Sequence, residues 1–148
     1  MMREKKVKIT ETRALSMLLL FYLLCDVLTL TSLLIWGVSP NVGDKFESQF
    51  ITAVLFAPII ETLVIHLPLI LLLYKLKMHP FFVILITAVL FALCHLGVGL
   101  AYPLIIFYPG LILTCTFYYF FTRFDKKTAI LSTTFVHMVY NFTSLMAV

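Results

Sequence analysis

Long apolar runs separated by short polar connections set the pattern of this chain. The runs cover residues 14–38, 50–74, 80–97, 101–122 and 128–147. A helix needs about 20 predominantly apolar residues to cross the hydrocarbon core of a bilayer, and each run is close to that length. The pattern therefore predicts five transmembrane helices.

The connections between the runs carry residues that end helices. The loop at 39–49 contains Pro, Asn and Gly, and Gly97 and Gly99 separate the third run from the fourth. Residues 1–13 are polar and basic, and the run that follows them is longer than the apolar stretch of a signal peptide. We therefore expect the first helix to be retained.

Composition indicates that lipid is the solvent of the folded chain. Of the 148 residues, 62% are hydrophobic and only 12% are charged, whereas a soluble domain is about half apolar and about a quarter charged. So short a chain cannot bury this much apolar surface within itself. The sequence therefore predicts an all-α integral membrane protein, a compact bundle of about five transmembrane helices that forms a single domain over 1–148.

The basic residues give the expected orientation in the membrane. With five spans, residues 1–13 and the loops at 75–79 and 123–127 share one side, and they hold every Lys and Arg except Lys45. Cytoplasmic loops are enriched in Lys and Arg. We therefore expect a multi-pass protein of the cell membrane with a cytoplasmic N-terminus and an outer C-terminus. Because the positive charge lies in short connections, we expect no nucleic-acid partner.

Polar side chains inside the apolar runs identify a candidate site. Glu61 lies in the middle of the second run, and an ionisable residue within a membrane helix marks a functional site by default because it is costly to place there. His95 lies near the end of the third run, and His137 and Asn141 are four residues apart on one face of the fifth. One such residue alone is often structural, but groups from three helices favour one buried, water-holding site.

Two chemistries fit these side chains. A buried Glu beside a His can hold and deprotonate a water molecule, while a second His and an Asn amide can donate hydrogen bonds to an oxyanion. That set suffices for peptide hydrolysis without a covalent intermediate. Equally, one Glu and two His match the ligands of an open catalytic zinc site, in which Glu61, His95 and His137 would bind the metal. The sequence predicts no cofactor firmly, and zinc stays open as the second choice.

Proline adds a local prediction beside the candidate acid. Pro58 lies three residues before Glu61. Because proline has no N–H group, it removes one backbone hydrogen bond and kinks the helix. The carbonyl that loses its donor needs another partner within the membrane. A kink at this point is suited to a site that water must enter.

Three motifs follow one another in a fixed order: Pro58-Ile-Ile-Glu61, Phe91-x-x-x-His95 and His137-x-x-x-Asn141. Their order and separations resemble the CPBP family of intramembrane endopeptidases, also called the CAAX-protease and bacteriocin-processing or Abi family. The resemblance covers 50–148 and implies that the last four helices form a catalytic core. It also implies a peptide or membrane-protein substrate, such as a prenylated or leader-bearing peptide or a bacteriocin precursor.

The resemblance implies a role for each polar residue of the motifs. Glu61 would be the general base on the attacking water, and His95 would be the second contact of that water. His137 and Asn141 would stabilise the oxyanion. We therefore take these four as the candidate catalytic residues, with Phe91 in a supporting position.

One motif departs from the pattern of the family, which usually has Glu-Glu-x-x-x-Arg. In this chain Thr62 replaces the second Glu and His66 replaces the Arg. The two positions are four residues apart and would otherwise form an ion pair on one helix face. Because both charges are lost together, no unpaired charge is left. We expect Thr62 and His66 to support the site.

Two other classes of function use the same polar groups. A non-catalytic member would act as a membrane scaffold or a bacteriocin-immunity protein that binds a peptide or partner in the cavity. A small transporter or proton relay is the least favoured, because the chain lacks the internal repeat that transporters often carry.

Overall fold

The structure, a computed structural model, describes residues 50–146 and ten residues of the first apolar run: Arg13, Ser16, Met17, Leu19, Leu20, Phe21, Leu23, Leu24, Val27 and Thr31. The polar N-terminus, the loop at 39–49 and most of the predicted helix 14–38 lie outside this part. Every regular element within the described residues is helical. The predicted all-α fold class is confirmed.

The second apolar run forms four consecutive helical segments: η1, a π-helix at Phe50–Phe56; α3 at Ala57–Glu61; η2, a π-helix at Thr62–His66; and α4 at Leu67–Lys75. The remaining elements are α5 at Pro80–Leu93, the 3-10 turn η3 at Leu96–Val98, α6 at Tyr102–Arg123 and α7 at Lys126–Met146. Among the described residues, three stretches are long and apolar enough to cross a membrane, namely Phe50–Lys75, Pro80–Val98 and Tyr102–Arg123. They make the chain a membrane protein.

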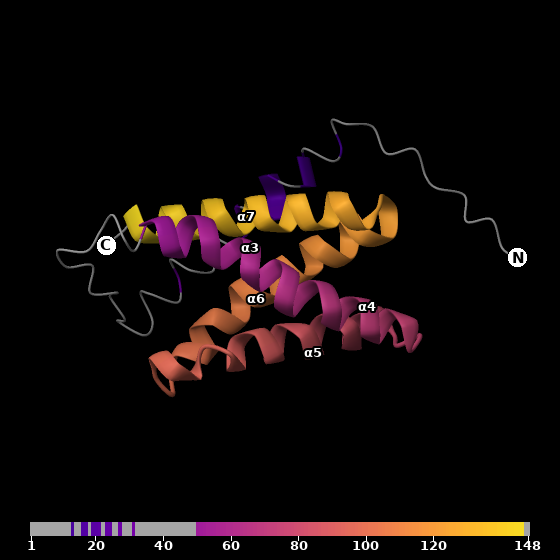
Figure 1. Cartoon of the computed structure of the whole chain (residues 1–148), viewed down its shortest axis with the longest axis horizontal. Helices are drawn as coiled ribbons and strands as arrows, with labels where there is room; N and C mark the ends of the chain where they lie inside the picture. The colour runs from indigo at the N-terminus through magenta and orange to yellow at the C-terminus, as the bar shows by residue number, and fades with distance from the viewer. Residues whose placement is uncertain are drawn as a thin grey trace, which may run out of the picture.

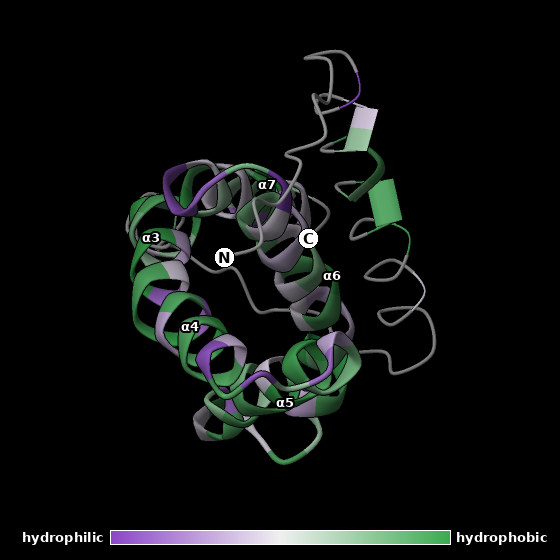
Figure 2. Cartoon of the chain, turned by 90° about the vertical axis from the view of Figure 1, so that its right-hand side faces the viewer, coloured by the Kyte–Doolittle hydropathy of each residue, from purple (hydrophilic) through white to green (hydrophobic). Residues whose placement is uncertain are grey.

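The helices surround a common axis. In Figure 1, α7 lies along one side and α5 along the other, the rod formed by α3 and α4 runs from beside α7 to beside α5, and α6 crosses between α5 and α7. Along the chain, α6 packs on both α5 and α7, and η1 packs on α7. Figure 2, viewed along the bundle, shows α7, α6, α5 and the α3–α4 rod as a ring, with the first-run residues outside it.

Two hydrophobic clusters hold the ring together. One lies near the α6 N-terminus and comprises Phe91, Ile106, Ile112, Leu113, Val136 and Tyr140. The other lies near the loops at 75–79 and 123–127 and comprises Ile70, Leu73, Val83, Phe117, Phe120 and Ala129. Phe21 of the first run reaches the ring of Tyr119, with the two ring centroids 6.0 Å apart.

Several hydroxyl groups point inward, while several large apolar side chains outside the two clusters point outward. Thr87, Thr114 and Thr133 are completely buried, whereas Val64 is 65% exposed and Leu131 is 70% exposed. A soluble protein hides large aliphatic side chains before it hides hydroxyl groups. The reversed arrangement is that of a bundle whose outer surface contacts lipid.

Prolines explain why the second run is not one regular α-helix. The sequence predicted a single kinked helix over 50–74, but two stretches of it are π-helical. Pro58 and Pro68 each lie in the first turn of the α-helical segment that follows a π-helix. A proline at such a position leaves one earlier carbonyl without its donor, and a π-bulge is one way for a helix to absorb the break.

The α5 helix ends earlier than the apolar run does. The predicted helix extended to residue 97, but α5 ends at Leu93 and is followed by the η3 turn. Gly99 has a φ of 155°, a backbone conformation that favours glycine. The chain therefore reverses between α5 and α6 in a few residues, and His95 lies on the turn just beyond the helix.

Candidate active site

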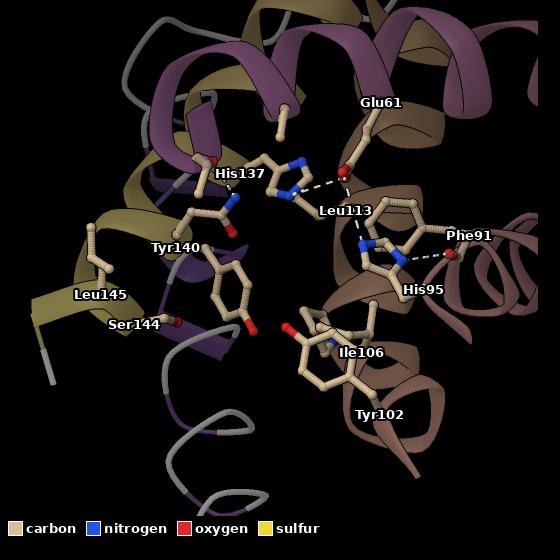
Figure 3. A pocket seen from close by; sticks show the side chains of 14 residues that line it. Glu61, Phe91, His95, Tyr102, Ile106, Leu113, His137, Tyr140, Ser144 and Leu145 are labelled. Atoms are coloured by element: carbon tan, nitrogen blue, oxygen red, sulfur yellow. Dashed lines mark hydrogen bonds and ion pairs between the residues drawn. The ribbon is translucent and has the colours of Figure 1, made fainter. Parts of the chain in front are cut away.

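A cavity of about 260 Å3 opens between the helices around Glu61 (Figure 3). Its walls come from η1, α3, α5, α6 and α7 and from the turn after α5. The lining residues among those described are Ala53, Ala57, Glu61, Phe91, His95, Tyr102, Ile106, Pro109, Leu113, His137, Tyr140, Asn141, Ser144 and Leu145. A water molecule takes up about 30 Å3 of the liquid, so the cavity has room for several.

The Glu61 carboxylate lies between two imidazole rings. Its Oε1 is 3.8 Å from Nε2 of His95, and its Oε2 is 3.6 Å from Nε2 of His137 (Figure 3). Both distances exceed those of direct hydrogen bonds. Polar atoms separated in this way are often bridged by a water molecule. The Glu61 side chain is 22% exposed, so water can reach it, although the Oε2 atom that faces His137 is buried.

His95 is held by the end of α5. Its Nδ1 lies 2.9 Å from the backbone carbonyl oxygen of Phe91, one of the last carbonyls of the helix, which have no partner within it. A carbonyl oxygen can only accept, so Nδ1 carries the proton and donates. In the neutral ring, Nε2 then presents a lone pair toward Glu61. The Phe91–His95 spacing of four residues thus fixes both the position and the tautomer of this imidazole.

Asn141 connects α7 to the π-helix that precedes Pro58. Its Nδ2 donates a hydrogen bond of 2.7 Å to the carbonyl oxygen of Ala53. In a π-helix a carbonyl accepts from the N–H five residues later, and five residues after Ala53 is Pro58, which has none. The Asn141 amide therefore satisfies the carbonyl that the proline leaves free. One amide hydrogen is used in this way, and the other remains.

Phe91 packs against three imidazole rings. The centroid of its ring lies 4.9 Å from that of His66, 5.0 Å from His95 and 5.9 Å from His137. The ring is 2% exposed. Gly110 of α6 approaches so closely that a Cβ atom there would lie 2.8 Å from Cδ1 of Phe91. Phe91 therefore fixes how the histidines sit relative to one another.

Thr62 and His66 do not line the cavity. Both are completely buried, and neither the hydroxyl of Thr62 nor either ring nitrogen of His66 has a hydrogen-bond partner within the described residues. His66 packs against the ring of Phe91, which lines the cavity. With α-helical spacing His66 would point well away from the face of Glu61, but the π-helical pitch of η2 reduces that angle.

Two tyrosines of the cavity were missed in the sequence. The hydroxyl groups of Tyr102 and Tyr140 point toward each other across the cavity, on the side away from Glu61 (Figure 3). A tyrosine inside an apolar run usually packs against neighbouring helices. The sequence pattern therefore did not mark either tyrosine as a site residue. A signal was nevertheless present, because Tyr140 follows His137 by three residues and shares its helix face.

The three zinc candidates of the sequence, Glu61, His95 and His137, meet at the cavity. Among the described residues, no group of three or more His, Cys, Asp and Glu side chains is arranged to hold a metal. Zinc ligands would lie about 2.0–2.2 Å from a shared ion. Here each imidazole instead faces a different oxygen of Glu61.

Comparisons with known proteins identify the family. Residues 45–143 match the family described as type II CAAX prenyl endopeptidase Rce1-like. The matched range covers more than half of the chain and contains Glu61, both cavity histidines and Asn141. No curated protein and no solved structure matches the chain. The family match confirms the resemblance found in the three sequence motifs, and the chain belongs to the Rce1-like family of type II CAAX prenyl endopeptidases.

Proposed function

We propose that the protein is an intramembrane endopeptidase in which Glu61 activates the water that cleaves a peptide bond. The observation that carries this proposal is the Glu61 carboxylate, 3.6 and 3.8 Å from two imidazole nitrogens, in the wall of an open cavity. The endopeptidase family supports a peptide substrate and a lipid environment. The catalytic core is the segment 50–148.

Glu61 acts as the general base. A water between Glu61 and His95 donates one hydrogen to the carboxylate and the other to the Nε2 lone pair of His95. As the water oxygen bonds to the substrate carbonyl carbon, Glu61 takes one proton. The carbon–nitrogen bond then breaks, and Glu61 returns that proton to the leaving amine nitrogen. The products are a new carboxyl end and a new amino end.

His137 supplies a donor for the oxyanion. Its Nδ1 is buried and has no hydrogen-bond partner among the described residues. A buried N–H without a partner is rarer than an acceptor without one, so the proton belongs on Nε2, the nitrogen that faces the cavity. The two histidines then present opposite hydrogen-bonding groups to the cavity, an acceptor and a donor. His95 offers a lone pair to the water, and His137 offers an N–H to the substrate oxygen.

Asn141 supports the same oxyanion with its remaining amide hydrogen. The bond from its Nδ2 to the Ala53 carbonyl holds the amide in one orientation, so the second N–H needs no reorganisation during the reaction. A preorganised donor of this kind stabilises developing charge at little cost. The contact also ties α7 to the helix that carries Glu61.

The orientation of the protein follows from its charges. The five Lys and Arg residues within 50–146 all lie at the α4–α5 and α6–α7 connections or at the helix ends beside them. For the orientation, each connection is taken together with these ends as the loops at 75–79 and 123–127. By the positive-inside rule these loops face the cytoplasm. The N-terminus then lies in the cytoplasm and the C-terminus outside.

Replacement of Glu61 with glutamine tests the proposal. The amide keeps the size of the side chain and removes the base, so cleavage should fall by about 100-fold to 10,000-fold. New protein N-termini in membranes of cells that express each variant, counted by mass spectrometry, measure cleavage. Lys77→Gln, an exposed change in a distant loop, is the matched control. If Glu61→Gln keeps the wild-type set of new N-termini, the proposed catalysis is wrong.

A further inference from the structure

We infer that the substrate is an uncharged internal segment of a polypeptide that reaches the cavity from the non-cytoplasmic side of the membrane. The inference rests on the proposed function, because it names what the Glu61 site would cut. It differs from a CAAX tail, which is a free C-terminus modified on a Cys four residues from the end. Two independent observations support it: where the cavity opens, and which charges its walls lack.

The cavity opens at one end of the bundle. Among the residues that line it, His95 follows the end of α5, Tyr102 is the first residue of α6, and Ser144 and Leu145 lie in the last turn of α7. Ala53 lies in η1, at the start of its span. These four chain regions meet at the same end of the molecule (Figure 1). The mouth of the cavity is therefore at that end.

The opposite end carries five cations, while Lys45 precedes η1 in the loop at 39–49. Lys75 and Lys77 follow α4, and Arg123, Lys126 and Lys127 lie at the α6–α7 connection; all five are exposed. The turn at residues 94–101, at the mouth of the cavity, contains no Lys or Arg. The positive-inside rule places the loops with the lysines and arginines in the cytoplasm. A peptide would then enter from the other face, close to the headgroups of the outer leaflet.

The charge of the cavity walls argues against a free carboxylate. In a CAAX tail, three residues follow the scissile bond, so the terminal carboxylate lies about 10 Å from the reacting carbonyl in an extended chain. Among the described residues that line the cavity there is no Lys or Arg, and the one charged group is the carboxylate of Glu61. An anion brought into these walls would lose its hydration without gaining a cationic partner.

The same walls suit an uncharged peptide segment. Ile106, Leu113 and Leu145 offer apolar contacts, while Tyr102 and Ser144 provide hydroxyl groups at the mouth (Figure 3). Hydroxyl groups can bond to the backbone amides of an extended peptide whatever its side chains are. The cavity is therefore built to receive a stretch of chain and not to recognise a chain end.

Cysteine labelling tests the side of the mouth without any assumption about catalysis. In a variant with Cys25, Cys94 and Cys115 replaced, Leu100→Cys marks the mouth, where Leu100 is 89% exposed, and Lys77→Cys marks the other end. A membrane-impermeant maleimide applied to intact cells should label the first variant and should label the second only after lysis. The reverse result would overturn the inference and leave the proposed peptidase chemistry standing.

Matched reporters test the substrate. A single-span membrane protein carries one uncharged apolar segment either outside or inside the cell, and cleavage is compared between wild type and Glu61→Gln. Cleavage of the outer reporter by the wild type alone supports the inference. Cleavage confined to the inner reporter overturns the inference but retains the peptidase. If neither reporter is cut, the substrate inference fails, and the count of new N-termini in Glu61→Gln cells decides the peptidase separately.

A pair of synthetic peptides tests the missing cation. The two peptides share one sequence, with the scissile bond three residues from the end, and terminate in either a carboxylate or a carboxamide. The purified wild-type protein in lipid should cut the carboxamide at least several-fold faster. Faster cleavage of the carboxylate would show that the site recognises a chain end, and the inference would be wrong.

Discussion

Alanine at Gly110 should disturb the site, although Gly110 does not line the cavity. The added Cβ would lie 2.8 Å from Cδ1 of Phe91 and 3.5 Å from the carbonyl oxygen of Ala88. Because carbon atoms pack at about 3.5–4.0 Å, the ring would have to move by about 0.7–1.2 Å. The ring is 2% exposed and has no flexible end whose rotation could relieve the strain.

The displaced ring would push on the histidines that face Glu61. Overpacking of this kind lowers the free energy of unfolding by about 1–3 kcal/mol. Misplacement of catalytic groups by about 1 Å can reduce turnover about 100-fold. We therefore expect Gly110→Ala to lower both the melting temperature and the cleavage rate, with the larger proportional effect on cleavage.

The assay compares Gly110→Ala with Gly97→Ala. A Cβ atom at Gly97 would meet nothing within 4 Å, so this control should keep wild-type melting and cleavage in the same lipid. A double variant, Gly110→Ala with Phe91→Leu, should regain part of the lost stability because the smaller side chain makes room. If Gly110→Ala melts and cleaves like the wild type, the view of Phe91 as a fixed support is refuted.

Three further changes probe separate contacts. Asn141→Leu leaves the Ala53 carbonyl buried without a donor, which should lower the free energy of unfolding by about 1–3 kcal/mol and reduce cleavage; an unchanged melting temperature would contradict this. His66→Leu removes two ring nitrogens that have no partner among the described residues, so the melting temperature should stay equal or rise, and a marked fall would reveal a partner. Chelators should leave cleavage unchanged if Glu61 acts on water alone, and loss of cleavage that zinc restores would favour a metal.

Spacing alone predicted much of the arrangement around Glu61. The apolar runs within 50–146 predicted the helices that the structure describes there. The three motifs predicted the family that the comparison confirms. The structure brings both imidazoles within 3.8 Å of the Glu61 carboxylate, where the sequence expected these groups to meet. A polar side chain on a membrane helix avoids lipid and faces the interior of the bundle. The meeting of such side chains is therefore easier to predict in membrane proteins than in soluble folds.

Backbone irregularity could not be predicted in the same way. The sequence indicated a kink at Pro58 but not the π-helices at Phe50–Phe56 and Thr62–His66, which pack against α7 and α5. The sequence required a partner for the carbonyl freed by Pro58, yet Asn141 is 88 residues from Ala53. Only the packed bundle identifies that partner.

The π-helices have a consequence for how the chain tolerates insertions and deletions. A π-turn holds about one residue more than an α-turn. A π-helix therefore accommodates one extra residue without interrupting the helix. Removal of one residue from Phe50–Phe56 would restore α-helical pitch there and rotate Ala53 by about 100° relative to Glu61. The amide of Asn141 would then lose its acceptor while the carboxylate stayed in place. Homologous chains with one residue fewer in this span should therefore lack either the proline or the asparagine.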